Sequence, residues 1–276
     1  MKLSCLPVSL FGKLIGGAMT VPQWAEMARR IGFEGFDISS MFIKNHTPVY
    51  LEWLEEEIRR QEIPLVMMTA YPDFTVPDMK QREREAAYFL ADLAVASQLG
   101  CRYLRITAGQ SYPGEDTEQA MKMAMESLKR MREATENTGI RLVYENHAKP
   151  SAWKYFDFTY DADLFLEICG RLREIDIGIN FDIGNFTAFG TDALEILKKV
   201  YDQVETVHIS DMKEYGSFNP VEIGQGKAPI ATALRFLQNK KFSGWMTIEE
   251  ASGNGTAGIQ SAYEYIKNLW EHSDST

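Results

Sequence analysis

Residues 177–182 read Ile-Gly-Ile-Asn-Phe-Asp, with apolar side chains at every second position. Successive side chains of a β-strand point to opposite faces, so this pattern predicts a strand with one apolar face. That face carries Ile177, Ile179 and Phe181, and the opposite face ends in Asp182. A strand that packs helices on one side and ends in a polar group on the other is typical of a closed barrel surrounded by helices.

Seven other short runs have β character, and amphipathic helical patterns fill nearly every gap between them. These runs span residues 3–8, 35–38, 65–70, 103–107, 141–146, 204–209 and 246–250. Eight strand–helix units predict an α/β protein, a single-domain (β/α)8 TIM barrel over residues 1–276. The Gly-rich GxGxxG loop of an open, doubly wound sheet is absent from the sequence.

The composition excludes several classes of function. With 29 Lys+Arg against 39 Asp+Glu, the formal net charge is -10, which disfavours a nucleic-acid partner. No apolar run is long enough to span a membrane, so we expect no membrane association. The apolar start of the chain lacks a cleavage site, and we interpret it as the first strand of a cytoplasmic protein. Three scattered cysteines argue against a disulfide framework or a structural zinc site.

The same alternation assigns an inward face to the other strands. The inward residues at the carboxyl ends of four consecutive strands are Glu145, Asp182, His208 and Glu249. Barrel enzymes build their sites at this end. Three carboxylates in one pocket would repel one another unless a cation lay between them. We therefore predict one divalent metal, and Mn²⁺, Co²⁺, Mg²⁺ and Zn²⁺ all accept such ligands.

Structural explanations exist for each of these residues taken alone. A carboxylate at a strand end is often paired with a basic residue inside the barrel, and Arg105 and Arg141 could serve that purpose. A single inward histidine is often part of the core. Asp37 also points inward, and its role is open between a structural and a substrate contact.

Five short motifs contain or follow these residues. They read YENH at 144–147, FDIGN at 181–185, VHISDMK at 207–213, GQG at 224–226 and GWMTIEE at 244–250. In this order and spacing, the chain resembles the sugar phosphate isomerase/epimerase family of xylose-isomerase-like barrels over nearly its whole length. The resemblance implies that Glu145, Asp182, His208 and Glu249 hold the metal. It also implies that Glu145 and Glu249 act as the catalytic acid–base pair of a keto-sugar epimerase.

The activity implied is that of a divalent-metal-dependent isomerase or epimerase of a keto sugar, acting through a metal-stabilised enediolate. Return of the proton to the opposite face inverts the carbon, and its return to the neighbouring carbon interconverts aldose and ketose. Loss of a β-hydroxyl from the same intermediate would instead make the enzyme a dehydratase or lyase acting on an inosose or a 3-keto-glycoside.

Further residues are expected to contact this small carbohydrate substrate. They are His147, Asn185, Asp211, Lys213, Trp153, Arg105 and Asp37. Asn185 stands where many family members carry a histidine, which weakens that assignment. Aromatic residues after the strands could wall the pocket against water, and the candidates are Phe11, Tyr71, Phe74 and Trp153.

Two other classes of protein are alternatives to this interpretation. The apurinic endonuclease branch of the same barrels binds a three-metal cluster, which needs more histidines than the four in this chain. A barrel that only binds a sugar, or that serves as a partner subunit, would have no need to keep all four ligands. Dimers and tetramers are usual in the family, so the resemblance also allows a homo-oligomer.

Overall fold

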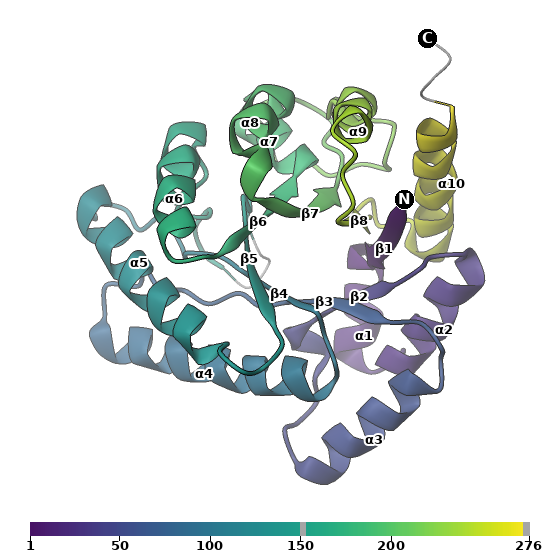
Figure 1. Cartoon of the computed structure of the whole chain (residues 1–276), viewed down its shortest axis with the longest axis horizontal. Helices are drawn as coiled ribbons and strands as arrows, with labels where there is room; N and C mark the ends of the chain where they lie inside the picture. The colour runs from purple at the N-terminus through teal and green to yellow at the C-terminus, as the bar shows by residue number, and fades with distance from the viewer. Residues whose placement is uncertain (150–152, 273–276) are drawn as a thin grey trace.

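The computed structural model describes residues 1–149 and 153–272, and it shows the predicted single-domain (β/α)8 barrel (Figure 1). The eight strands are parallel and lie in the order β1-β8-β7-β6-β5-β4-β3-β2. They span Lys2–Leu6 (β1), Phe36–Ser39 (β2), Leu65–Thr69 (β3), Tyr103–Ile106 (β4), Arg141–Glu145 (β5), Gly178–Asp182 (β6), Val204–Ile209 (β7) and Trp245–Glu249 (β8). Each lies within two residues of the run expected from the sequence.

Helices surround the barrel as an outer ring in Figure 1. The α-helices span Phe11–Gly16 (α1), Val21–Ile31 (α2), Pro48–Arg59 (α3), Met79–Gln98 (α4), Thr117–Ala134 (α5), Ala162–Glu174 (α6), Ile183–Phe189 (α7), Ala193–Val200 (α8), Ile230–Asn239 (α9) and Gly255–Glu271 (α10). Three 3₁₀-helices span Val8–Leu10 (η1), Ser40–Phe42 (η2) and Tyr201–Gln203 (η3). None of the helices in the described ranges combines the length and apolar character needed to cross a membrane.

The outward-facing strand residues form the main hydrophobic core with the helices. Ile179, Phe181 and Val207 belong to this core and are fully buried, as the alternation predicted. A second, smaller cluster of Val66, Met67, Tyr103 and Val143 lies inside the barrel toward the amino ends of the strands. These side chains fill that end of the interior, so the polar inward residues gather at the opposite end.

The barrel closes at a seam between β1 and β2, the two ends of the strand order. There the backbone N–H of Glu34 donates to the Leu3 carbonyl at 3.0 Å, and the Leu3 N–H donates to the Glu34 carboxylate at 2.7 Å. Ser4 also donates to Asp37 across the seam. By contrast, β1 and β8 pair along a regular ladder from Lys2 to Leu6. At this seam, the Glu34 side chain makes a hydrogen bond of the kind that backbone groups make between the other neighbouring strands.

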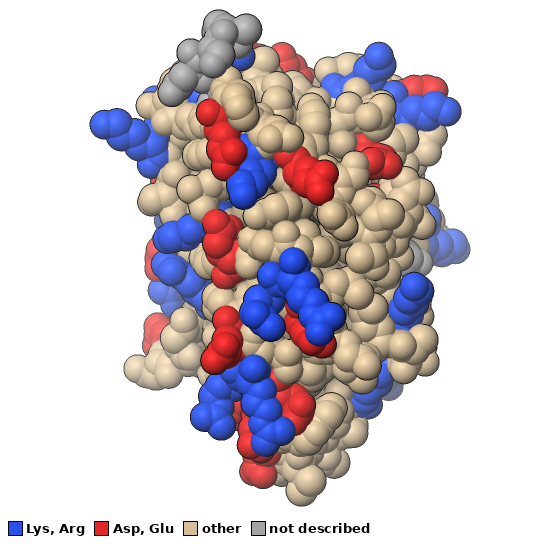
Figure 2. Space-filling model, turned by 90° about the vertical axis from the view of Figure 1, so that its right-hand side faces the viewer, with Lys and Arg blue, Asp and Glu red and all other residues tan. Residues whose placement is uncertain are grey.

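Charged residues of both signs are interspersed over the face that carries α10 and α2 (Figure 2). Arg30 pairs with Glu26 on α2, and Arg60 pairs with Glu56 at the end of α3. Such exposed pairs contribute little to stability. Their mixed signs do not create the broad basic surface that a polyanion would need.

A capping box stabilises the start of α2. The Thr20 hydroxyl accepts from the Gln23 N–H, the Gln23 side chain accepts from the Thr20 N–H, and Pro22 occupies the first turn. Thr20→Ala removes the first of these bonds, and we expect it to lower the free energy of unfolding by about 1 kcal/mol. Urea denaturation measures the change.

Thr47 provides the matched control, because it precedes α3 but its side chain makes no capping hydrogen bond to that helix. Thr47→Ala should therefore change stability by clearly less. Equal losses for the two variants would show that the Thr20 cap does not stabilise α2.

Candidate metal centre

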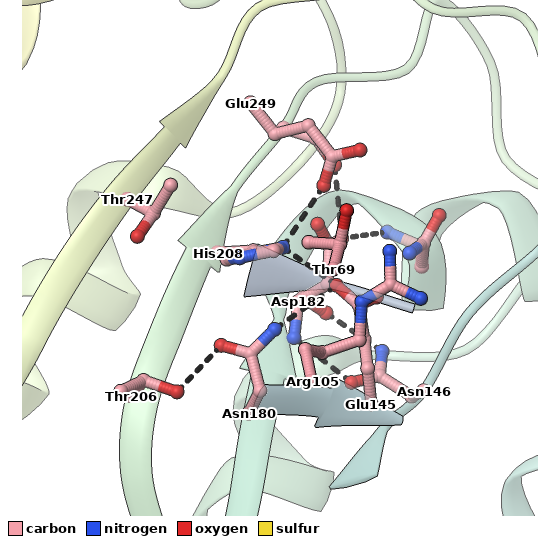
Figure 3. Close-up of polar contacts among 12 residues, drawn as sticks. Thr69, Arg105, Glu145, Asn146, Asn180, Asp182, Thr206, His208, Thr247 and Glu249 are labelled. Atoms are coloured by element: carbon pink, nitrogen blue, oxygen red, sulfur yellow. Dashed lines mark hydrogen bonds and ion pairs between the residues drawn. The ribbon is translucent and has the colours of Figure 1, made fainter. Parts of the chain in front are cut away.

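The structure brings the four predicted metal ligands together at the carboxyl end of the barrel (Figure 3). They come from β5, β6, β7 and β8, and they are Glu145, Asp182, His208 and Glu249. Each offers one ligand atom, and these atoms all lie within 4.8 Å of one another. The parity of the strands produces this arrangement, because each of the four strands carries an inward residue at or next to its carboxyl end.

His208 lies between two of the carboxylates. Its Nδ1 is 2.6 Å from Glu145 Oε1 and 3.0 Å from Glu249 Oε2. Burial favours the neutral imidazole, but the two glutamates outweigh burial and raise the pKa of His208 well above its usual range. For Glu145, burial acts to raise the pKa, but the positive charges of Arg105 and His208 outweigh burial and lower the pKa to about 2.

Arg105 is fully buried and reaches Glu145 from β4, with Nε 3.0 Å from Oε2. Its guanidinium also lies 4.4 Å from the centre of the Tyr71 ring. The structure thus places Arg105 in the ion pair that the sequence left open as an alternative to a substrate contact. Arg141, the other candidate, pairs with Glu205 and Asp176 at the opposite end of the barrel.

Asp182 is both a candidate ligand and the N-cap of α7. Its Oδ1 accepts from the Asn185 N–H at 2.5 Å and from the Ser210 hydroxyl at 2.9 Å. Its Oδ2 is buried and, among the described residues, meets no hydrogen-bond donor. Burial and the nearby charges of Glu249 and Glu145 raise the pKa of Asp182 well above its usual range.

These observations test whether the residues fit a divalent cation. A buried carboxylate oxygen without a donor lies beside two further carboxylates and an imidazole, which is the oxygen and nitrogen donor set that Mn²⁺, Co²⁺, Mg²⁺ and Zn²⁺ accept. A cation at this centre would neutralise the repulsion that raises the Asp182 pKa. The residues fit the predicted metal.

Two asparagines next to the candidate ligands hold Asp182 and Glu145 in position. The Asn146 side chain donates to the Asp182 carbonyl and accepts from the Asp182 N–H, both at 2.8 Å. Asn180 accepts from Thr206 at 2.8 Å and donates to Glu145 at 3.1 Å. The sequence placed Asn180 on the inward face, but it did not indicate that Asn146 clamps the neighbouring strand.

Close packing also fixes the end of β7 against α7. A Cβ added to Gly184 would lie 2.6 Å from the backbone oxygen of Ser210, a distance that real side chains do not reach. Glycine at position 184 therefore lets Ser210 approach closely enough to donate to Asp182. The FDIGN motif thus contains a steric requirement as well as a ligand.

A cavity of about 380 Å³ opens above the candidate metal centre, and Glu249 borders it. Of the expected substrate contacts, His147 and Asn185 line this cavity. His147 makes an edge contact with Tyr71, with ring centres 6.1 Å apart, and burial lowers the pKa of His147 to about 4. Phe11 and Tyr71, two of the expected wall aromatics, also border the cavity.

The remaining expected contacts lie elsewhere in the described part of the chain. Asp211 accepts backbone N–H bonds from Met212, Gly224, Gly226 and Ala228, so it holds the loop around the GQG motif. Lys213 is exposed on the loop after β7, and Trp153 is buried, and neither borders the cavity in the described structure. Phe74 is fully buried.

Asp37 lies within the barrel and forms a polar layer with two hydroxyls. Thr247 donates to its carboxylate at 2.8 Å, and Ser4 donates at 3.3 Å. Burial raises the pKa of Asp37 to about 6. These bonds link β1, β2 and β8, and Asp37 does not border the described cavity.

Asp157, in the segment after β5, is a buried acid that the sequence did not single out. Its carboxylate accepts from the N–H and the hydroxyl of Thr159, both at 2.8 Å. Burial raises the pKa of Asp157 to about 8. Between an unfolded pKa of about 4 and this value, the folded protein retains a proton that the unfolded chain releases, so stability falls as the pH rises.

Asp157→Asn keeps the oxygen that accepts from Thr159 and removes the titration. We expect the stability difference, variant minus wild type, to rise by about 1.4 kcal/mol per pH unit within the window from pH 5 to pH 8. Urea denaturation across this range measures it. A difference that stays constant with pH would show that Asp157 is ionised in the folded protein.

The candidate metal centre predicts one divalent ion per chain. His208→Ala and Asp182→Ala should each reduce the bound metal to a small fraction, because each removes a ligand from a set of four. Elemental analysis of dialysed protein measures the content. His46→Ala, which alters an exposed histidine outside the cluster, should retain the ion. Metal content that is unchanged in both ligand variants would contradict the assignment.

Comparison with known proteins identifies the family of the chain. The model of the family described as xylose isomerase-like TIM barrel matches residues 25–269. An inosose dehydratase of Clostridium beijerinckii is 20% identical over 287 residues, covering 92% of this chain and 91% of the relative. A Haemophilus influenzae protein provisionally named L-ribulose-5-phosphate 3-epimerase is 20% identical over 263 residues, covering 88% and 87%.

Among solved structures, the IOLI protein with a bound zinc atom has a TM-score of 0.82 at 18% identity, covering 100% of both chains. At this identity, the likeness shows the fold alone. The family match extends over most of the chain, and it includes all four strands that carry the candidate ligands. The chain belongs to the xylose isomerase-like TIM-barrel family.

Proposed function

We propose that the protein is a divalent-metal-dependent isomerase or epimerase that transfers a proton next to the carbonyl of a keto sugar. The observation that carries the proposal is the pair of glutamates on either side of His208, both within hydrogen-bond distance of its Nδ1. Two carboxylates at one centre can serve as base and acid in the same turnover.

The two glutamates differ in their access to substrate. Glu249 borders the cavity and its side chain is 16% exposed, whereas Glu145 is fully buried and paired with Arg105. A divalent ion at the centre would supply positive charge to stabilise the substrate oxygen as it becomes negative. Glu249 would exchange a proton with the substrate from the cavity side. Glu145, held by Arg105 and Asn180, would serve as the second acid–base group.

The residues around the cavity would orient the sugar. His147 and Asn185 border the cavity and would bind substrate hydroxyls. The buried Nδ1 of His147 meets no hydrogen-bond partner among the described residues, so it is free to bind one on the substrate. The ring of Tyr71, which also borders the cavity, would help to exclude water from the reacting carbon.

A second candidate function uses the same centre. If a β-hydroxyl leaves after the proton is removed, the enzyme is a dehydratase or lyase, acting on an inosose or a 3-keto-glycoside. The relative named inosose dehydratase supports this candidate. A barrel that only binds sugar, or acts as a partner subunit, is less well supported because all four ligands lie together.

Exchange of the substrate's α-proton with solvent deuterium tests the proposal. Metal-loaded protein should exchange this proton in a panel of ketoses, inososes and 3-keto-glucosides in D₂O, observed by NMR. Glu145→Gln and Glu249→Gln should each reduce exchange by at least about 100-fold, because each removes a proton-transfer group. The product spectrum then distinguishes epimerisation, isomerisation and dehydration.

Glu214→Gln is the matched control, because Glu214 is an exposed acid on the loop after β7. It should exchange at the wild-type rate. Metal content is measured for every variant, so that loss of the ion is separated from loss of proton transfer. Native exchange by a metal-loaded Glu249→Gln or Glu145→Gln variant would refute the two-carboxylate mechanism.

A further inference from the structure

The cavity above the candidate metal centre has two unlike sides. One side is apolar, and we call it the apolar wall: Val8, Phe11, Met41, Met212, Phe218 and Pro220. The other side is polar and is formed by His147, Lys149, Asn185 and Ser210. A ligand that displays hydroxyls in every direction would satisfy the second side and lose hydrogen bonds to water against the first.

The strand order places part of the apolar wall across the barrel from the polar side. Val8 and Phe11 follow β1, Met41 follows β2, and the rest of the wall follows β7. On the polar side, His147 and Lys149 follow β5, Asn185 follows β6, and Ser210 ends β7. In a closed barrel of eight strands, β1 and β2 lie across the axis from β5 and β6. Two of the candidate ligands, Glu145 and Asp182, come from β5 and β6, so the reacting end of a ligand would lie toward the polar side.

The apolar wall is built into the fold. The ring of Phe11 packs edge-on against buried Phe42, with ring centres 4.9 Å apart. The loop that carries Phe218 is a hairpin, closed by a bridge between Met212 and Pro220 and by the Lys213 N–H donating to the Asn219 carbonyl. Gly216 at its tip donates to the Thr187 carbonyl in α7. These contacts hold the wall in place before any ligand binds.

Phe218 remains 39% exposed in this hairpin, at the rim of the cavity. A ligand that covers an aromatic ring at a pocket rim gains affinity by burying its apolar surface. The cavity volume of about 380 Å³ lies within the range that holds drug-sized ligands. The space and its lining therefore suit a molecule with one hydroxylated end and one apolar end.

We propose that the substrate is a keto sugar linked to an apolar aglycone, with the aglycone against the apolar wall and the keto sugar toward the metal centre. This assignment rests on the proposed function, since it names the substrate class of the same site. A glycosidic oxygen joins the two parts, so the aromatic or alkyl group stays outside the proton-transfer chemistry.

Calorimetric titration of Mn²⁺-loaded protein with methyl and phenyl 3-keto-β-D-glucosides, and with their galacto counterparts, tests the assignment. The members of each pair differ only in the aglycone. We expect the phenyl compound of the preferred series to bind at least about tenfold more tightly, from burial of its apolar surface. Phe11→Ser and Phe218→Ser should each remove most of that advantage and leave the methyl compound within about twofold.

Tyr215→Ser is the matched control, because Tyr215 is an exposed aromatic on the same loop that does not border the described cavity. It should keep the phenyl preference. Equal binding of methyl and phenyl compounds, no binding of the phenyl compounds, or equal weakening of both by the wall variants would overturn the assignment. The last result would mean that the aromatic rings stack on the sugar itself.

Deuterium exchange in the same ligands separates this assignment from the proposed function. Exchange without a phenyl preference would leave the proton-transfer function standing and refute the aglycone assignment. A phenyl preference that the wall variants remove, without exchange in any ligand, would support the wall and refute the proton-transfer function.

Discussion

Electrostatic repulsion among two buried acids and a third at the edge of the cavity is the constraint on which the functional end of the barrel depends. Glu145, Asp182 and Glu249 share a space from which most water is excluded, and no packing of apolar groups could compensate them. Arg105 and His208 supply positive charge from inside the protein, and Asp182 still has its pKa raised. The positive charges of the protein therefore neutralise the three acids only in part, and a bound cation would neutralise the remaining negative charge.

Much of the surrounding structure keeps this arrangement from relaxing. If the strands could slide by one residue, every inward acid would turn toward the helices. The Asn146 side chain forms two hydrogen bonds with the backbone of Asp182. Hydrogen bonds from Thr206 to Asn180 and from Asn180 to Glu145 connect β7 to β6 and β6 to β5. Gly184 permits the contact that places Ser210 against Asp182. These residues contact the ligands and fix the level at which the acids meet.

The strands and the four-residue centre were predictable because both follow from a period of two. Once residues 177–182 were assigned an outward and an inward face, the positions of Glu145, His208 and Glu249 followed from the same rule. The loops have no such period. Asp211 and Trp153 were assigned by nearness in sequence to a strand end, but the first turns toward backbone amides and the second is buried. Arg105 had two chemically reasonable partners, and only the three-dimensional distance to Glu145 separates them.

The seam between β1 and β2 has a consequence for how the chain acquires its fold during synthesis. β1 has its regular ladder with β8, which is synthesised after the other seven strands of the barrel. Toward β2, the described hydrogen bonds of β1 are the two with Glu34 and the bond between Ser4 and Asp37, so β1 has no regular ladder with its nearest neighbour in sequence. Contacts between the two ends of a chain are slow to form. β1, with the start of the apolar wall that follows it, can therefore be fully fixed in the barrel only after β8 has been synthesised.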